Sequence, residues 1–325
     1  MRSAQGVPDR EARLIRRVAV REAGRRLVDA LCEWLRERVS DEVPMARVRA
    51  LVAAGGVRVD GVEVRAAGRP LRRGQYVEAR LAPERLRPRA LELDRPFELT
   101  ADRVIFLDDV LIAIDKPPGL PTHATADPSR PSLVGHVERF LESRGVRATL
   151  AVHQRLDRDT SGVVVFGLDP RANEGLVRAF AERLAEKRYL ALTATPREPV
   201  SPRFRVSAAI GPATAGQPSV RVGGPDARAA VTDVIVREEL DGALLVEARP
   251  LTGRRHQVRV HLAHAGLPIL GDELYGRADP RLPRLMLHAW RLALPHPITG
   301  GPLRLEAPVP SDFGEVLATH QKRRG

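Results

Sequence analysis

The segment His153-Gln154-Arg155-Leu156-Asp157-Arg158-Asp159-Thr160-Ser161-Gly162 stands between two apolar stretches and ends directly before a β-branched run. Its most conspicuous carboxylate is Asp157. The Thr-Ser-Gly tail is suited to hydrogen bonding with nearby backbone groups, which fixes a sharp turn. An aspartate in such a turn, just before a buried strand, is well placed to project into a cleft. For an arbitrary aspartate, however, capping or bracing the loop is the more common role.

The sequence around this segment predicts an α+β fold. Residues 163–168 form a β-branched strand, and residues 170–185 form a helix with a proline at its start. A helix is also predicted at residues 133–143. Apolar runs predict further strands at residues 104–107, 111–115, 189–195, 231–236, 243–248, 285–294 and 303–305. Because the strands are many and lack βαβ spacing, we expect a mixed, largely antiparallel sheet.

A smaller helix-hairpin unit precedes this domain. Its first helix is predicted by apolar residues at three- and four-residue spacing: Leu27, Ala30, Leu31, Trp34 and Leu35. A second helix begins near Pro44 and ends at Gly55-Gly56. Two alternating runs joined by Asp60-Gly61 predict a hairpin over residues 57–64, and a strand over 76–81 completes the unit.

Composition therefore divides the chain into five parts. Residues 1–24 form an arginine-rich leader or a first short strand, and residues 25–81 form the small unit. A proline- and charge-rich linker occupies residues 82–99. The large domain covers residues 100–317, and residues 318–325 form a basic tail.

The charge of the chain predicts a polyanionic partner. The net charge is +12, and residues 1–90 hold 21 arginines against 12 acidic residues, whereas residues 91–325 hold 32 basic against 29 acidic residues. A surplus placed in the N-terminal quarter indicates nucleic acid most simply. The preference for arginine over lysine fits a GC-rich genome, but this explains neither the positive total nor its uneven placement.

Other bulk features limit the class of protein. The single cysteine, Cys32, allows neither an internal disulfide nor a cysteine-based zinc site. The first ten residues lack an apolar core, and no run of about 18 apolar residues occurs, so we expect no signal peptide and no membrane span. We expect a cytoplasmic monomer.

The pattern Arg155-Leu156-Asp157-x-x-Thr160-Ser161-Gly162 resembles the signature of the RluA-type RNA pseudouridine synthases. The family usually has histidine directly before Arg-Leu-Asp, whereas Gln154 separates His153 from Arg155 here, which leaves His153 without a role. Further segments resemble that family in the same order: Asp115-Lys116-Pro117-Pro118-Gly119-Leu120, Lys187-Arg188-Tyr189-Leu190-Ala191, Gly253-Arg254-Arg255-His256-Gln257-Val258-Arg259-Val260-His261-Leu262 with its continuation to Gly276, Arg284-Leu285-Met286-Leu287-His288-Ala289, and Ala307-Pro308-x-Pro310-x-Asp312-Phe313.

This resemblance implies an enzyme that breaks the N-glycosidic bond of a uridine in RNA, turns the uracil and rejoins it through C5. It implies no cofactor and no metal. Asp157 would be the catalytic carboxylate, as nucleophile or as base. Arg259 would pair with Asp157 and keep it ionised. Tyr189 would stack on the target base, which must be extruded from folded RNA, and assist proton loss from C5.

Further contacts implied by the resemblance are less specific. Leu287 would close the pocket against the uracil, although a core position is nearly as common for a leucine in an apolar strand. Arg155 and Thr160 would contact the substrate. Lys116 stays unassigned between a phosphate contact and a bracing role.

Residues 25–81 resemble the S-four-type RNA-binding domain, which is named after a ribosomal protein. The resemblance rests on the order of helix, glycine, Val-x-Val-Asp-Gly and Gly-Gln. In that family the second helix and the loop after it face RNA, which implies RNA contacts for Arg47, Arg49 and Arg58. The alternative is that these arginines form a solvated face. With this domain present, we expect large-subunit ribosomal RNA as the substrate, with transfer RNA as the runner-up.

Two readings compete with this one. The first is a zinc hydrolase that uses a histidine cluster together with Asp157: His256, His261 and His264. No His-Glu-x-x-His motif or cysteine pair supports it. The second is a non-catalytic RNA-binding or ribosome-assembly protein, against which the intact set of Asp157, Tyr189 and Arg259 argues.

Overall fold

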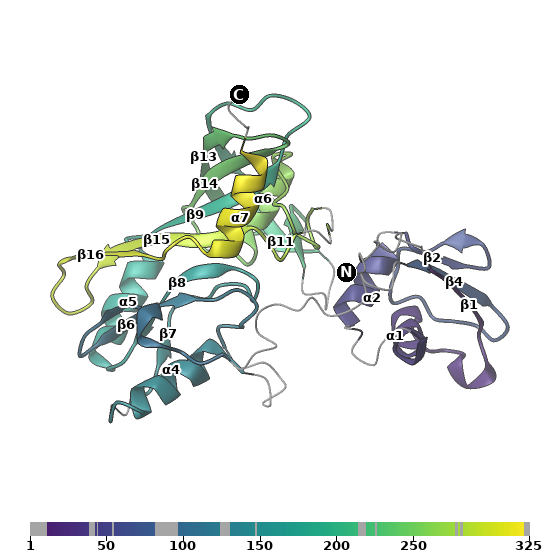
Figure 1. The fold of residues 1–325 in the computed structure, drawn as a ribbon, viewed down its shortest axis with the longest axis horizontal. Coiled ribbons are helices and arrows are strands. Elements are labelled where there is room, and N and C mark those ends of the chain that lie inside the picture. Colours follow the sequence, from purple (N-terminus) through teal and green to yellow (C-terminus); the bar gives the residue numbers. More distant parts are fainter. Residues whose placement is uncertain are drawn as a thin grey trace, which may run out of the picture. The chain divides into compact units, whose positions relative to one another are not determined.

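The structure is a computed structural model that describes residues 12–38, 43, 45–53, 55–81, 97–123, 131–146, 148–213, 219–224, 226–276, 279 and 282–321. The chain divides into two compact units, Met1–Ala90 and Leu91–Gly325 (Figure 1). Within the described ranges, none of the helices is both long and apolar enough to cross a membrane.

The smaller unit packs two helices against a four-stranded antiparallel sheet. The helices are α1 (Leu27–Arg38) and α2 (Met45–Ala53). The strand order is β1-β4-β2-β3, with bounds Ala12–Arg17, Tyr76–Leu81, Val57–Val59 and Val62–Glu63. The buried Trp34 indole of α1 donates a hydrogen bond to the Glu22 carboxylate at 2.9 Å, which satisfies both polar groups inside this core.

The two helices, the hairpin and the last strand of this unit are confirmed. Asp60 and Gly61 have φ angles of 53° and 81°, which is the turn geometry that Asp-Gly favours between two strands. The unit begins earlier than the expected boundary at Arg25, because β1 pairs with β4 along its whole length. Of the two expectations for residues 1–24, a leader or a first short strand, the strand is therefore present at Ala12–Arg17. Most of the expected linker, residues 82–96, lies outside the described residues.

The larger unit is built on a ten-stranded sheet. The main path is β10-β13-β14-β9-β15-β8-β6-β5, with β16 beside β15 and β7 beside β8. The only parallel pair among the described strands is β8 with β15, so the expected mixed and largely antiparallel sheet is confirmed. The bounds are β5 Val104–Leu107, β6 Leu111–Lys116, β7 Ala151–Val152, β8 Ser161–Gly167, β9 Glu186–Ala194, β10 Arg203–Ser207, β13 Val231–Glu239, β14 Ala243–Pro250, β15 Leu287–Pro295 and β16 Pro302–Glu306.

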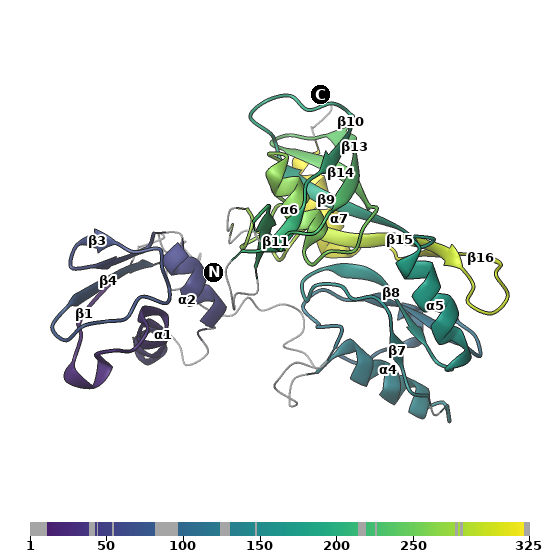
Figure 2. The ribbon, with the colours of Figure 1, turned by 180° about the vertical axis from the view of Figure 1, so that it is seen from behind.

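In the described part of the larger unit, four helices cover this sheet: α4 (Leu133–Glu142), α5 (Arg171–Ala181), α6 (Gln257–His264) and α7 (Ser311–His320). Figures 1 and 2 show α4 and α5 beside β6 and β8, and α6 and α7 beside β9, β13 and β14. Strand β8 is buried on both faces, since Val163 and Val165 pack in the cluster that holds α5 residues, whereas Val164 and Phe166 pack in the cluster that holds α4 residues. This explains why β8 reads as a continuous apolar run.

Several elements differ from the sequence prediction. Helix α6 is absent from it because Gln-Val-Arg-Val-His-Leu alternates polar and apolar residues like a strand. The short strands β10, β11 (Ile210–Pro212) and β12 (Val220–Val222) are also absent from it. Helix α5 ends at Ala181 rather than near residue 185. Helix α7 was missed as well, and it runs to His320, so residues 318–320 belong to the domain and not to the expected tail.

The crossing of β8 and β15 predicts a sensitive glycine. Gly162 has φ +116°, and a Cβ there would lie 2.2 Å from the Ala289 carbonyl oxygen. We expect Gly162→Ala to lower the free energy of unfolding by about 2 kcal/mol or more, measured by urea denaturation. Gly314 in α7 is the control, because nothing lies within 4 Å of a Cβ there, and Gly314→Ala should stabilise by up to about 1 kcal/mol. Equal stability of Gly162→Ala and the wild type would contradict this.

Candidate active site

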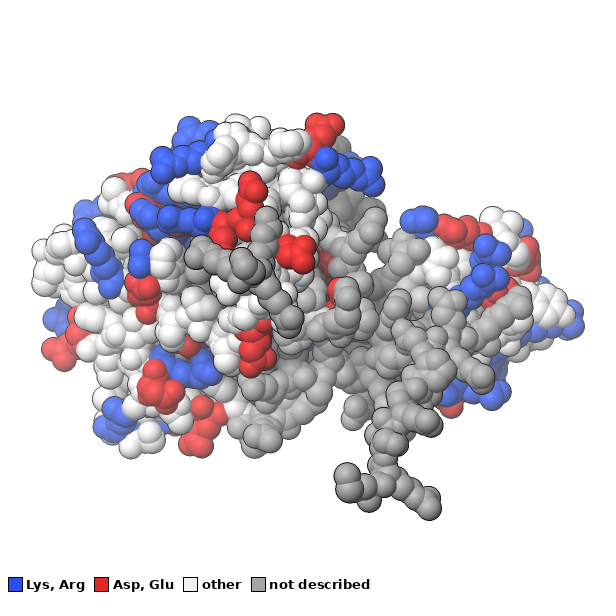
Figure 3. All heavy atoms as spheres, turned by 45° about the horizontal axis from the view of Figure 1, so that its top comes forward, with Lys and Arg blue, Asp and Glu red and all other residues white. Residues whose placement is uncertain are grey.

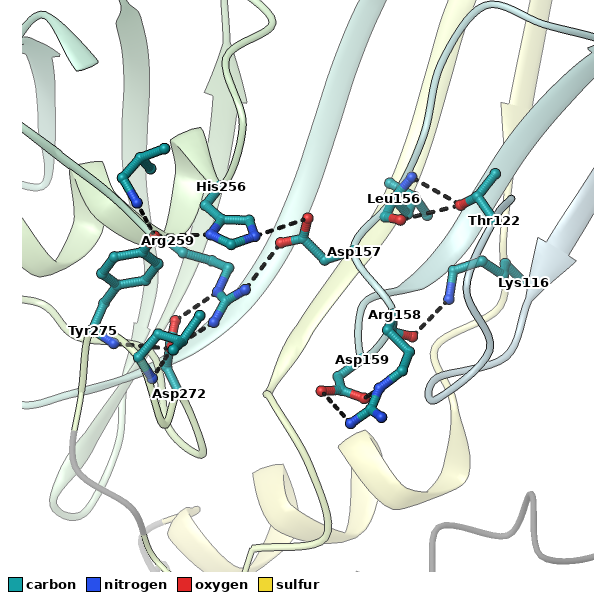
Figure 4. A network of polar contacts seen from close by, with 12 residues as sticks. Lys116, Thr122, Leu156, Asp157, Arg158, Asp159, His256, Arg259, Asp272 and Tyr275 are labelled. Carbon is teal, nitrogen blue, oxygen red and sulfur yellow. Dashed lines mark hydrogen bonds and ion pairs between the residues drawn. The ribbon is translucent and has the colours of Figure 1, made fainter. Parts of the chain in front are cut away.

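The loop between β7 and β8 holds Asp157 in place by backbone contacts on both sides. Upstream, the Leu156 N–H donates to Thr122 Oγ1 at 3.2 Å, and the Thr122 hydroxyl donates back to the Leu156 carbonyl at 3.1 Å (Figure 4). Downstream, Lys116 Nζ donates to the Arg158 carbonyl at 3.0 Å. The backbone from which the Asp157 side chain extends is therefore held in place on both sides.

Lys116 braces this loop from inside the protein. Its side chain is fully buried, and its ammonium also donates to the Pro117 and Leu120 carbonyls at 2.8 and 2.9 Å. Burial lowers the pKa of Lys116 to about 7. Because three backbone carbonyls use its three donors, the structure supports the bracing role and not a phosphate contact.

Arg259 on α6 joins two carboxylates. Its Nε and Nη2 donate to the two oxygens of Asp272 at 2.8 and 2.7 Å, and its Nη1 donates to Asp157 Oδ2 at 3.1 Å (Figure 4). Asp272 is buried and also accepts the backbone N–H groups of Leu274 and Tyr275. Burial alone would lower the pKa of Arg259, but Asp272 and Asp157 together raise it. The guanidinium is therefore a permanent, oriented cation beside Asp157.

His256 faces the other oxygen of Asp157. Its Nε2 lies 3.6 Å from Asp157 Oδ1, and its Nδ1 lies 2.8 Å from the Tyr275 hydroxyl. That hydroxyl accepts the Val220 N–H at 3.0 Å, so its own proton is free to be donated to His256 Nδ1. Burial is the main reason that the pKa of His256 is lowered to about 4, and the positive charges of Arg259 and Arg255 act in the same direction. The imidazole is therefore neutral, and a Tyr275 hydroxyl that donates to Nδ1 fixes the tautomer with its proton on Nε2, toward Asp157.

A cavity of about 810 Å³ opens in front of Asp157. Tyr189 of β9 lies on its wall, and burial, together with the charge of Asp157, raises the pKa of the Tyr189 hydroxyl, so it stays a phenol at neutral pH. Seven cationic side chains but only two carboxylates, those of Asp157 and Glu186, line the cavity. Such a lining suits a polyanion with an uncharged group inserted next to Asp157.

Six of the residues expected at the site do meet in this cavity: Asp157, Arg259, Tyr189, Leu287, Arg155 and Thr160. Leu287 also belongs to the core cluster around β14 and β15, so its two expected roles coincide. His153 also lines the cavity, with its Nε2 3.3 Å from the Asn173 side-chain oxygen on α5.

The structure describes the side chains of two of the three arginines expected to contact RNA in the smaller unit. Arg49 is exposed on α2, and Arg58 is exposed on β2, on the sheet face opposite the buried Val57 and Val59. The side chain of Arg47 lies outside the described part of the structure.

Sequence reasoning missed Asp272 and Tyr275, and it considered His256 only as a zinc ligand. The segment that contains Asp272 and Tyr275 matched the family, but no property of the residues alone showed that it folds back onto Arg259. The zinc hydrolase hypothesis is not supported, because both ring nitrogens of His261 are already in hydrogen bonds, one with the Thr232 hydroxyl and one with the Ala208 carbonyl. The described residues contain no group of three or more side chains suited to hold a metal ion.

Comparisons with known proteins agree with this fold. Residues 110–264 match the family described as RNA pseudouridylate synthase. The chain is 31% identical to ribosomal large subunit pseudouridine synthase D of Xanthomonas campestris pv. campestris, covering 91% of this chain and 89% of that protein. It is also 31% identical to ribosomal large subunit pseudouridine synthase C of Yersinia pestis, covering 94% and 95%. Human RNA Pseudouridylate Synthase Domain Containing 4 matches the structure with TM-score 0.55 and 26% identity, covering 67% of this chain and 92% of that one.

The mixed sheet is thus that of an enzyme that isomerises uridine. The chain belongs to the RNA pseudouridine synthases, and within them to the RluA type that its motifs predicted.

The Tyr275–His256 contact gives a direct test. Tyr275→Phe keeps the ring beside Arg259 but removes the hydroxyl that sets the His256 tautomer. We expect the single-turnover rate of pseudouridine formation to fall by roughly three- to tenfold, the size of one lost hydrogen bond. Tyr76→Phe, at an exposed position on β4, is the matched control and should leave the rate unchanged. An unchanged rate in Tyr275→Phe would show that this contact does not position Asp157.

Proposed function

We propose that this enzyme converts specific uridines of large-subunit ribosomal RNA to pseudouridine, with Asp157 as the catalytic carboxylate. The observation that supports this most is the setting of Asp157, whose side chain is 25% exposed, lies at the cavity and is held by Arg259. The choice of RNA rests on the curated relatives, two of which are named as large-subunit synthases.

The two oxygens of Asp157 have different surroundings. Oδ2 accepts from Arg259, whereas Oδ1 has only the longer contact to His256. Oδ1 is therefore the oxygen we assign to the reacting sugar or base. In the overall change the C1′–N1 bond breaks, the uracil turns, a C1′–C5 bond forms, and the proton lost from C5 is balanced by one gained at N1. Either attack by Asp157 or removal of a sugar proton by it is compatible with this geometry.

Tyr189 and Leu287 have positions that suit the uracil ring. Both line the cavity with Asp157, and Tyr189 offers an aromatic surface for stacking. Because its pKa is raised, the Tyr189 phenol is suited to stacking and hydrogen bonding rather than to taking the C5 proton. The target base must leave its stack to reach this position.

RNA affinity would come from cations near the cavity rather than from a uniformly basic surface. On the face of the larger unit shown in Figure 3, basic and acidic side chains are interspersed. The cavity lining differs, with seven cations against two carboxylates. Phosphate contacts at this lining would make the affinity fall with salt.

The smaller unit supports structured RNA as the substrate. Its two helices and hairpin match the order expected for an S-four-type domain, and Arg49 on α2 is exposed. We assign this unit to RNA binding.

Pseudouridine mapping tests the reaction and the substrate together. Total RNA from cells that lack the gene is compared with RNA from cells restored with the wild-type or the Asp157→Asn protein, by carbodiimide-blocked primer extension. We expect one or a few large-subunit sites to be lost and restored only by the wild type. A thermal melt of Asp157→Asn controls for folding. Loss of transfer RNA sites instead would identify transfer RNA as the substrate. Full activity of folded Asp157→Asn would refute the role of Asp157.

The role of the smaller unit is tested by salt dependence. If Arg49 contacts a phosphate, Arg49→Met should reduce the slope of log affinity against log salt by about one for a large-subunit RNA fragment. Arg304→Met removes the same charge from an exposed position on β16 and should leave the slope unchanged. Equal slopes for both variants and the wild type would show that Arg49 belongs to a solvated face.

A further inference from the structure

Lys187 lines the active-site cavity and lies two residues before Tyr189 on β9. Residues two apart on a strand point to the same side, about 6.6 Å apart, and both line the cavity. Arg188, between them, is not part of the cavity lining and pairs with Glu186 and Glu247. Lys187 is thus presented to whatever lies beside the base that stacks on Tyr189.

The ammonium of Lys187 has a weak partner at rest. Its Nζ lies 5.5 Å from the centre of the Phe180 ring, and among the described residues it makes no hydrogen bond or ion pair. Burial lowers the pKa of Lys187, and no nearby carboxylate offsets this. A cation–π contact stabilises by about 0.5 to 1 kcal/mol, less than a charged hydrogen bond, so an anion would displace the ring easily.

The cavity gives an anion access to the ammonium, since Lys187 and Gly253 both line it. A Cβ on Gly253 would lie 3.8 Å from Lys187 Nζ, so this glycine is the lining residue beside the charge and carries no side chain that could cover it. Other cations of the lining are already engaged: Arg259 with Asp272, Arg249 with Glu186, and Arg254 with the Ala229 carbonyl. Lys187 is therefore a cation of the lining that is still available.

Arg183 provides an independent sign of a binding role. It follows α5 with φ +63°, a left-handed conformation in which glycine or asparagine is usual. The backbone there closes the helix, since the Ala185 N–H donates to the Ala179 carbonyl. The exposed Arg183 side chain also lines the cavity. An arginine that opposes its own backbone preference at the rim of a site indicates that its side chain has a function there.

We infer that Lys187 and Arg183 form a subsite for a phosphodiester of the RNA next to the target uridine. This rests on the proposed function, because it places the uracil between Asp157 and Tyr189. Lys187 would contact the phosphate inside the cavity, and Arg183 would contact the backbone at the rim. The subsite fixes the sugar of the target nucleotide from the side remote from Asp157.

The test uses short RNAs that contain the mapped target uridine. In a set of substrates, an uncharged methylphosphonate replaces each phosphate within two nucleotides of that uridine, one at a time. Affinity and single-turnover rate are measured for the wild type, Lys187→Met, Lys187→Arg and the control Arg304→Met. Lys187→Met keeps the apolar stem beside Phe180 and removes only the charge.

We expect Lys187→Met to weaken affinity for unmodified RNA about tenfold, with a smaller effect on the bound-state rate, and Lys187→Arg to restore most of it. In the wild type, one methylphosphonate should cause a similar loss, and Lys187→Met should show no further loss with that substrate. Equal methylphosphonate penalties in the wild type and Lys187→Met at every linkage would overturn the subsite. Failure of the wild type to convert unmodified RNA would instead count against the proposed substrate.

Arg183 gives a second test, in which stability and RNA affinity are expected to change in opposite directions. Arg183→Gly relieves the left-handed backbone and should raise the melting temperature, while it weakens RNA affinity several-fold. A stabilised protein with unchanged RNA affinity would show that Arg183 has no part in the subsite. Lower stability would show that the arginine is retained for the fold.

Discussion

The arrangement of the site depends on the buried ion pair between Asp272 and Arg259. A guanidinium placed at the cavity without a partner would lose several kcal/mol in hydration. Asp272 offsets this with two short hydrogen bonds, and its own charge is satisfied by two further backbone N–H groups. Only Nη1 of Arg259 then points to the cavity, where it meets Asp157. Asp272 thus orients Arg259, and Arg259 in turn orients Asp157.

The same constraint explains the irregular start of α6. His256 has φ 50°, an uncommon conformation for a residue with a side chain. This turn places the imidazole over Asp157 while the next turn of the helix carries Arg259 into its pair with Asp272. The Tyr275 ring lies 5.1 Å from the Arg259 guanidinium and its hydroxyl meets His256, so one side chain supports both groups. The uncommon backbone conformation of His256 thus accompanies an arrangement in which Arg259 donates to one oxygen of Asp157 and His256 lies 3.6 Å from the other.

The sequence predicted the sheet class and most strands, and its family resemblance implied six of the residues that line the cavity. Strands such as β8 and β14 were accessible because β-branched or apolar runs report burial directly. Helix α6 was not, because its alternating pattern is that of a strand and tertiary contacts decide its conformation. Asp272 and Tyr275 were missed for a related reason. Their roles come from contacts with Arg259 and His256, which lie 13 and 19 residues away in the sequence, and such contacts have no local sequence pattern. For residues 1–24 the sequence left a leader and a first short strand as alternatives, because the pairing of β1 with β4 is what forms the strand.

The parallel pairing of β8 with β15 is confined to two residue pairs, Ser161 with His288 and Gly162 with Ala289. On one side of this narrow seam lie β5, β6 and β8, and on the other lie β9, β14 and β13. Asp157 enters just before β8, whereas Tyr189 and Arg259 come from the far side. The candidate site therefore lies where two otherwise separate antiparallel sheets are joined. Each sheet is free to gain or lose outer strands and loops in evolution, and so to fit different RNAs, without moving the carboxylate.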